Sequence, residues 1–360
     1  MSDPSARMKQ GLARRRRQPR AIDLFSGCGG LTLGLKRAGF EVVGAVDSEP
    51  LAVETYQANH REVRVWATDI RKLSASLVME RLRLSKGKLD LLAGCPPCQG
   101  FSSVRTLNGK RKVRSKANNL IFEFLRFVRV LRPKAIMLEN VPGLGSNWRF
   151  RAFRLQLTQL GYKHDHRVLD ASDFGVPQRR RRLILIATLS GDPKFADVDP
   201  LRPTVRTAIA GLPSPGRSGD QCHDHSEKRA DRVLSLIKRI PKNGGSRASL
   251  GESRQLTCHR RTDGFHDVYG RMKWSSVAPT ITGGCVNPSK GRFLHPSQDR
   301  AITLREAALL QTFPCRYFFS LERGKFAAAE MIGNALPPEF VRRHAVEVRR
   351  VLRGVSRKAL

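Results

Sequence analysis

The chain has 360 residues, enough for a substantial hydrophobic core and one or two domains. Its 66 Lys and Arg residues far outnumber its 31 Asp and Glu residues, and the resulting charge of +35 indicates a polyanionic partner, either nucleic acid or an anionic membrane. No apolar run approaches the roughly 18 residues of a membrane span, and the basic N-terminus lacks the apolar core of a secretory signal. Seven cysteines, an odd number, fit a reducing cytosol, so we expect a cytoplasmic protein.

Residues 1–20 contain seven Arg and Lys residues, one Asp and almost no apolar side chains. Such a composition cannot bury enough apolar surface to fold, so a disordered basic arm is expected. The arm is either a plain solvated tail or an accessory contact to phosphates.

A nucleotide-binding unit is indicated next. Residues 21–25 are typical of a short strand, residues 26–30 are a glycine-rich turn, and the apolar spacing that follows is helical. Such a unit brings backbone close to a ligand at a helix N-terminus. Asp47 ends the next expected strand, twenty residues after Gly27, where a carboxylate can accept hydrogen bonds from ribose hydroxyls. Thr32 replaces the third glycine of the dinucleotide fingerprint, so this pattern alone does not decide between cofactors.

A cysteine follows another expected strand end. The apolar residues 91–93 are typical of a buried strand, which Pro96 and Pro97 interrupt because proline donates no hydrogen bond and fixes φ. Cys98 therefore stands just beyond the carboxyl end of a strand, the edge at which open α/β sheets bind ligands. The spacing Cys95-x-x-Cys98 also occurs in redox pairs and zinc sites, but no second such pair follows.

Polar residues also mark two later strands. The apolar residues 135–138 lead to Glu139, a carboxylate that would be costly to bury without a role. Gln178, Arg180 and Arg182 precede the apolar residues 183–189, and the arginines between them would point to the other side of an extended chain.

These segments together resemble the DNA (cytosine-5)-methyltransferase family. The resemblance spans about residues 22–350, with the motifs in the family's order: Asp-Leu-Phe-Ser-Gly-Cys-Gly-Gly-Leu from Asp23, Pro-Cys-Gln-Gly-Phe-Ser from Pro97, Glu-Asn-Val from Glu139, Gln-x-Arg-x-Arg from Gln178 and Gly-Asn-Ala-Leu-Pro-Pro from Gly333. It implies an α/β fold with the Rossmann-like mixed sheet of S-adenosylmethionine (SAM)-dependent methyltransferases, flanked by helices, and a second, smaller, loop-rich target-recognition domain.

The resemblance also implies a domain order. The basic arm 1–20 would precede a SAM-binding catalytic domain at 21–190, a target-recognition domain at 191–290, and a segment at 291–360 that returns to the catalytic domain. Residues 191–290 are rich in Pro, Gly, Ser, Arg and His, so we expect little regular core there, and their basic and aromatic residues suit contacts to base edges in the major groove. Residues 105–116, rich in Arg, Lys, Ser, Asn and Gly, match the family's loop that closes over DNA.

By the same resemblance the cofactor is SAM. Phe25 would stack on the adenine and Asp47 would hold the ribose, while Asp69 would accept from the adenine amino group or, as an open alternative, cap a turn. The other expected cofactor contacts lie in the glycine-rich turn and at four later positions, namely Gly27, Cys28, Gly29, Gly30, Pro97, Leu120, Asn334 and Ala335.

The family's chemistry assigns the catalytic residues. The Cys98 thiolate would add to C6 of a flipped-out cytosine and make C5 nucleophilic toward the SAM methyl group. Glu139 would hydrogen-bond the ring N3 and amino group, Arg180 or Arg182 would favour the thiolate, and Arg182 would contact the cytosine O2. No metal is required.

The resemblance therefore implies a sequence-specific methyltransferase that acts on double-stranded DNA as a monomer. Because no nuclease, helicase or chromatin-reading segment is attached, a stand-alone bacterial or phage enzyme is expected, with a companion restriction endonuclease left open. Three alternatives remain: tRNA methylation by the same chemistry, although the Cys-Phe-Thr signature of that branch is missing; a basic nucleic-acid-binding module with a degenerate cofactor site; and a nicotinamide oxidoreductase.

Overall fold

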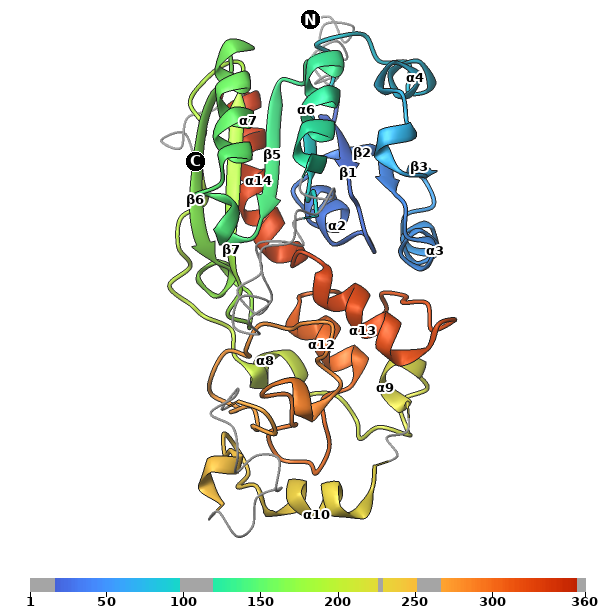
Figure 1. Ribbon diagram of the computed structural model, residues 1–360, viewed down its shortest axis with the longest axis vertical. Coiled ribbons are helices and arrows are strands. Elements are labelled where there is room, and N and C mark those ends of the chain that lie inside the picture. The colour runs from blue at the N-terminus through green and yellow to red at the C-terminus, as the bar shows by residue number, and fades with distance from the viewer. Residues whose placement is uncertain (1–16, 98–118, 226–228, 251–266, 355–360) are drawn as a thin grey trace, which may run out of the picture.

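The computed structural model describes residues 17–97, 119–225, 229–250 and 267–354. A seven-stranded sheet forms the upper half of the molecule in Figure 1, in the order β3-β2-β1-β4-β5-β7-β6. The strands are β1 (Arg20–Leu24), β2 (Glu41–Asp47), β3 (Arg64–Ala67), β4 (Leu91–Gly94), β5 (Ala135–Asn140), β6 (Lys163–Asp170) and β7 (Arg181–Thr188). Strand β7 runs antiparallel to both neighbours and the pairs from β3 to β5 are parallel, so the predicted mixed α/β sheet is confirmed.

Helices cover both faces of this sheet. One face packs against α4 (Ala75–Arg81), α6 (Leu120–Leu131) and α7 (Trp148–Gln159). The other face packs against α2 (Gly30–Arg37), α3 (Pro50–Asn59) and the last helix, α14 (Pro338–Leu352). The sheet is thus the middle layer of three, as in other doubly covered α/β folds.

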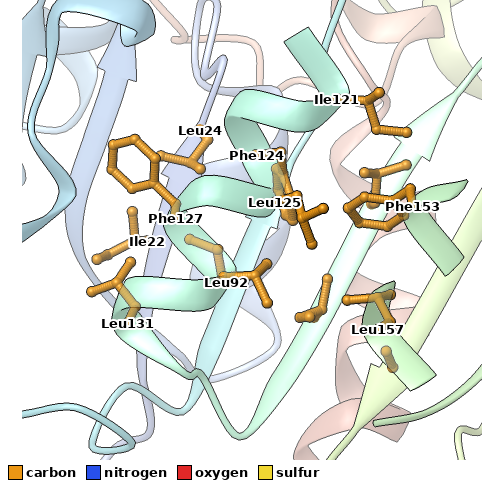
Figure 2. Close-up of a cluster of buried hydrophobic side chains, with 14 of the residues drawn as sticks. Ile22, Leu24, Leu92, Ile121, Phe124, Leu125, Phe127, Leu131, Phe153 and Leu157 are labelled. Carbon is orange, nitrogen blue, oxygen red and sulfur yellow. The ribbon is translucent and has the colours of Figure 1, made fainter. Parts of the chain in front are cut away.

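The side chains of β1 alternate between these two layers. Ile22 and Leu24 join the cluster of Figure 2, in which Phe124 and Phe127 of α6 lie over the strands. Asp23 points to the opposite layer, where it accepts a hydrogen bond from Thr32 of α2. Because a strand has a period of two residues, the apolar pattern of β1 fixes the side on which Asp23 is buried.

The lower half of the molecule contains α8 (Val205–Ile209), α9 (Gln221–Asp224), α10 (Asp231–Arg239), α12 (Leu304–Leu310) and α13 (Gly324–Asn334). The described parts of residues 191–290, where we expected little regular core, form only short helices, and buried residues of α8 and α9 join an apolar cluster that α12 and α13 complete. We expected residues 291–360 to return to the catalytic domain, but α12 contacts α8, α9 and α13, whereas α14 contacts α2 and β5. The domain boundaries themselves stay a prediction.

Short single-turn helices complete the secondary structure: η1 (Ile70–Lys72), η3 (Pro142–Leu144), η4 (Ala171–Phe174), η5 (Arg247–Ser249) and η7 (Pro288–Lys290). The predicted basic arm lies mostly outside the described residues, but Arg20 is not part of an arm, since it starts β1 opposite Glu41. Within the described ranges, no helix has both the length and the apolar character to cross a membrane.

Candidate active site

Four parallel strands, β1, β2, β4 and β5, end at the same edge of the sheet. Their last residues are Leu24, Asp47, Gly94 and Asn140, and Figure 1 shows this edge facing the lower half of the molecule. Carboxyl ends of parallel strands are where ligands bind in open α/β sheets. The predicted site residues beside these strand ends are thereby brought to one rim.

The glycine-rich turn after β1 adopts backbone angles that few residues other than glycine tolerate. Gly27 has φ of +51° and Gly29 has φ of +93°, in the left-handed region that favours glycine. A Cβ on Gly30 would lie 2.5 Å from the carbonyl oxygen of Leu336, so the start of α2 needs glycine for close approach of the chain that precedes α14. Asp47 at the end of β2 accepts a 2.7 Å hydrogen bond from the Gly27 N–H. The turn is therefore a preformed loop at a helix N-terminus with a carboxylate beside it.

Two buried polar atoms beside this turn have no hydrogen-bond partner among the described residues, Asp23 Oδ1 and Ser26 Oγ. Burial, with a smaller contribution from the nearby charge of Asp47, raises the pKa of Asp23 to about 8. Unsatisfied buried polar atoms are costly, which fits a site that a ligand with hydrogen-bond donors completes. SAM carries such donors and a positive charge, so the residues present fit this cofactor.

The other expected cofactor contacts are placed as follows. Phe25 is half-buried beside the turn with φ of +62°. Leu120 is the first residue of α6 and partly buried, Pro97 is exposed beyond β4, and Asn334 and Ala335 end α13. All are at or beyond the ends of elements, as a ligand rim requires.

Asp69 is a turn-capping residue in the structure. Its carboxylate accepts from the Arg71 N–H at 2.9 Å and pairs with the Arg71 guanidinium. The hydrogen bonds from Arg71 lower the pKa of Asp69 to about 2. The capping interpretation is thus confirmed, and the adenine contact stays a prediction.

Glu139 and Arg182 form an ion pair at the rim. Glu139 Oε1 lies 2.8 Å from Arg182 Nε, and both side chains are almost buried. Burial first, and then the charge of the nearby Glu139, raises the pKa of the Cys95 thiol well above its usual value. Next to Glu139, the Asn140 amide donates to the Pro96 carbonyl at 2.8 Å, which anchors the chain leaving β4. The Glu-Asn pair thus holds both an arginine and the start of the cysteine loop.

The Gln-x-Arg-x-Arg segment alternates as predicted, with Gln178 and Arg180 buried and Arg179 and Arg181 exposed. The Arg180 guanidinium donates to the carbonyls of Ile281 and Gly333 at 3.0 Å each. Burial, and then the charge of Arg182, lowers the pKa of Arg180 well below its usual range. Arg180 therefore ties the sheet to segments of the lower half, while Arg182 is the arginine that contacts Glu139.

Several site residues were missed or fall outside what the structure describes. Cys98 and the predicted loop at 105–116 lie outside the described residues. Gln311 belongs to none of the predicted motifs, yet it accepts a hydrogen bond from the Gln178 side chain, a contact between residues 133 apart that no local pattern signals. Tyr269 and Trp274 belong to the segment expected to read bases, but they pack inside the protein: Tyr269 is buried, and Trp274 packs against His295 and Arg206.

In the described part of the chain, no group of three or more metal-ligating side chains is present.

Comparison with known proteins agrees with this geometry. Residues 20–350 match a family model described as C-5 cytosine-specific DNA methylase. The chain is 38% identical to the Type II methylase M.HgiDII of Herpetosiphon aurantiacus, covering 94% of this chain and 97% of that protein. It is 34% identical to the Type II methyltransferase M1.HphI of Haemophilus parahaemolyticus, covering 88% of this chain and 83% of the relative.

Among solved structures, a protein described as a DNA modification methyltransferase encoded within an E. coli prophage superposes with a TM-score of 0.67 at 26% identity, covering 93% of this chain and 100% of that one. The match of sheet, motifs and chain length extends over nearly the whole molecule. This chain belongs to the C-5 cytosine-specific DNA methylase family and is a DNA (cytosine-5)-methyltransferase.

Proposed function

We propose that the protein methylates C5 of a cytosine within a specific sequence of double-stranded DNA, with SAM as the donor and Cys98 as the covalent nucleophile. The observation that carries the proposal is the Glu139–Arg182 pair, which lies on the same rim as the glycine-rich turn. Because ligands of open α/β sheets bind at the carboxyl ends of the strands, this position supports a shared site for the cofactor and the target base.

Cytosine C5 is a poor nucleophile, so the chain must activate it. Addition of the Cys98 thiolate to C6 forms a C–S bond and leaves C5 with enamine character, which is covalent catalysis. Glu139 hydrogen-bonds the ring N3 and amino group during this addition, and Arg182, which already orients Glu139, contacts the cytosine O2. When bound, SAM supplies an electrophilic methyl group, and loss of the C5 proton then allows the Cys98 sulfur to leave.

The turn of Gly27 to Gly30, the Asp47 carboxylate and the unpartnered oxygens of Asp23 and Ser26 are the groups we propose to hold the cofactor. Phe25, Asp69, Pro97, Leu120, Asn334 and Ala335 complete the proposed contact set. Arg180, in this proposal, acts on the site through the segments it ties together.

Duplex cytosine hides C5 and C6 in the stack, so the base must be flipped out, at a cost of a few kcal/mol. The net charge of +35 supports phosphate contacts that offset this cost, and it makes binding steeply salt-dependent. The lower half, which includes α8, α9 and α10, is proposed to recognise the sequence. The Type II names of the relatives support a place in a restriction-modification system.

The test is methyl transfer from labelled SAM to DNA, followed by digestion and identification of the modified nucleoside. We expect 5-methylcytosine, abolished in Cys98→Ser and retained in Cys315→Ser, a matched control at an exposed cysteine. Oligonucleotides with 5-fluorocytosine at the methylated position should trap a covalent adduct on Cys98. Label on adenine, or full activity of Cys98→Ser, would reject the proposal.

A further inference from the structure

We propose that His60 and Tyr317 are positioning residues for the cofactor turn, so that the segment following α12 controls the affinity for SAM through one hydrogen-bond chain. The inference rests on the proposed function in that the turn of Gly27 to Gly30 is taken to bind SAM. It concerns residues that neither the motifs nor the family's catalytic chemistry assign.

The hydrogen-bond chain links four residues, namely Lys36, His60, Tyr317 and Cys28. The Tyr317 hydroxyl donates to the Cys28 carbonyl at 2.6 Å. His60 Nε2 lies 2.9 Å from the same hydroxyl oxygen, and Lys36 Nζ lies 2.8 Å from His60 Nδ1. Since a carbonyl only accepts, the single hydroxyl proton goes to Cys28, and His60 Nε2–H must donate to Tyr317.

This assignment requires a neutral His60 whose Nδ1 accepts from the Lys36 ammonium. Burial first, and then the charge of Lys36, lowers the pKa of His60 to about 4, so the neutral ring is the form present at neutral pH. Every donor in the chain then meets an acceptor. The direction of all three hydrogen bonds is fixed, from Lys36 toward the turn.

The hydrogen-bond chain ends at one peptide unit, between Cys28 and Gly29, at the centre of the turn. The carbonyl of Cys28 accepts from Tyr317, and the N–H of the same unit, on Gly29, donates to the Ser26 carbonyl at 2.9 Å. Both ends of this peptide plane are therefore held. A turn of glycines has the most backbone freedom to lose on ordering, so such external hydrogen bonds set how well it is preorganised for a ligand.

Packing of Gly29 supports the same role. A Cβ at this position would lie 2.6 Å from both His60 Nε2 and Tyr317 Oη. The two side chains thus occupy the space directly behind the turn, and both are buried, with 2% exposure for His60 and 4% for Tyr317. Positive φ and close approach together require glycine here.

Tyr317 links this turn to the lower half of the molecule. It is 289 residues from Cys28 in sequence, and its ring packs against Phe313 and Phe319 at centroid distances of 4.8 and 5.2 Å. Cys28 belongs to the same apolar cluster. A change in the packing of the segment after α12 can therefore reach the cofactor turn through the Tyr317 hydroxyl as well as through the apolar contacts of Cys28.

Tyr317→Phe is the direct test, because it removes the hydroxyl and keeps the ring. The Kd for SAM, measured by isothermal titration calorimetry on the full chain, should rise about threefold to tenfold, the effect of one buried hydrogen bond. In steady-state assays the KM for SAM should rise more than the KM for DNA. A residue that only stabilises the fold would not produce this split.

Tyr162→Phe is the matched control. Its hydroxyl donates to the Pro133 carbonyl at 2.6 Å, and the residue is 3% exposed, but it contacts the opposite end of the sheet. The control should lose comparable stability while the Kd for SAM stays at the wild-type value. If Tyr317→Phe unfolds, His60→Gln, which leaves the Tyr317 hydroxyl in place, should show the same selective loss.

Different outcomes would reject the proposed function and the positioning role of Tyr317. Wild-type protein that binds no SAM would reject the proposed function. Wild-type protein that binds SAM, with a Tyr317→Phe variant of equal affinity or with a Tyr162→Phe variant equally impaired, would overturn this inference alone.

Discussion

The Glu139 carboxylate and the Arg182 guanidinium meet at 2.8 Å across the antiparallel pair β5 and β7, with 11% and 16% of their side chains exposed. The two residues are far apart in sequence. They come together because the register of β5 and β7 pairs Asn140 with Leu183, the residue that follows Arg182. The reversal of β7 thereby delivers an arginine to the rim formed by the parallel strands. This pairing gives the first prediction.

Arg182→Ala should strongly destabilise the protein, because it leaves Glu139 as an uncompensated charge. Removing one partner of a fully buried ion pair costs about 3–5 kcal/mol, and the residual exposure here lowers that figure. The double variant Glu139→Gln with Arg182→Met should recover part of the loss, as measured by urea unfolding. Asp192→Asn, which breaks the exposed Lys163–Asp192 pair, should leave the unfolding midpoint unchanged. A double variant no more stable than Arg182→Ala would contradict this account.

The second prediction concerns the buried amides of Gln178 and Gln311. Gln178 Nε2 donates to Gln311 Oε1 at 2.8 Å and Gln178 Oε1 accepts from the Ile281 N–H at 2.7 Å, while Gln311 Nε2 donates to the Ile332 carbonyl at 2.6 Å. Gln311→Glu would turn the last donor into an acceptor that faces a carbonyl. We expect a loss of about 1–3 kcal/mol at pH 7.5, because a buried acceptor is left unsatisfied.

Gln156→Glu is the control for this substitution, because a carboxylate there keeps the hydrogen bond from Arg129, and the lost donor to Gln159 lies at an exposed contact where water can replace it. Its denaturation midpoint should match the wild type. Equal midpoints for Gln311→Glu and wild type would show that the amide chain contributes nothing to the join between β7 and the helices α12 and α13.

The outline of the site was predictable from sequence because strand ends have local signals. Prolines after residues 91–93, a carboxylate after residues 135–138 and glycines after residues 21–25 each mark where a chain leaves the sheet, and parallel strands bring those points together. The alternation that buries Gln178 and Arg180 also followed from the period of an extended chain.

The long-range polar contacts were not predictable in this way. Tyr317 meets His60 across 257 residues, and Arg271, one basic residue among many by composition, is fully buried and donates to the carbonyls of Ile237 and Ile240. A single sequence shows charge and periodicity, but it does not show which arginine of a basic segment turns inward to satisfy carbonyls. Tertiary packing decides this.

The third prediction concerns thiol reactivity. Burial raises the pKa values of Cys28 and Cys285 to about 12 and that of Cys222 to about 11, whereas Cys315 is exposed. Because the thiolate is the reactive form, iodoacetamide at pH 8 should modify Cys315 long before these three in the native protein. Peptide mass spectrometry after timed quenching gives the order, and urea-unfolded protein, in which all should react, is the control. Early alkylation of Cys285 with Cys315 intact would contradict the packing described.

The last prediction follows from Asp23, whose pKa burial raises to about 8. An unfolded Asp titrates near 3.9, so between about pH 4 and pH 8 the folded protein keeps a proton that the unfolded chain has lost. Stability therefore falls as pH rises through this window and levels off above about pH 8. Asp23→Asn has no proton to lose and still offers an oxygen to the Thr32 hydroxyl, so its advantage over wild type without cofactor should grow with pH.

Urea unfolding at pH 5, 6, 7 and 8 measures this difference, with a limiting slope of about 1.4 kcal/mol per pH unit. Glu54→Gln on α3, which replaces an exposed carboxyl, should follow the wild type at every pH. Asp23→Asn should also bind SAM more weakly, since it replaces the carboxylate whose Oδ1 has no protein partner. A variant whose stability relative to wild type rises with pH, and whose affinity for the cofactor is lower, would show that the unfavourable burial of Asp23 is retained for ligand binding. Parallel stability curves for Asp23→Asn and wild type would contradict the raised pKa.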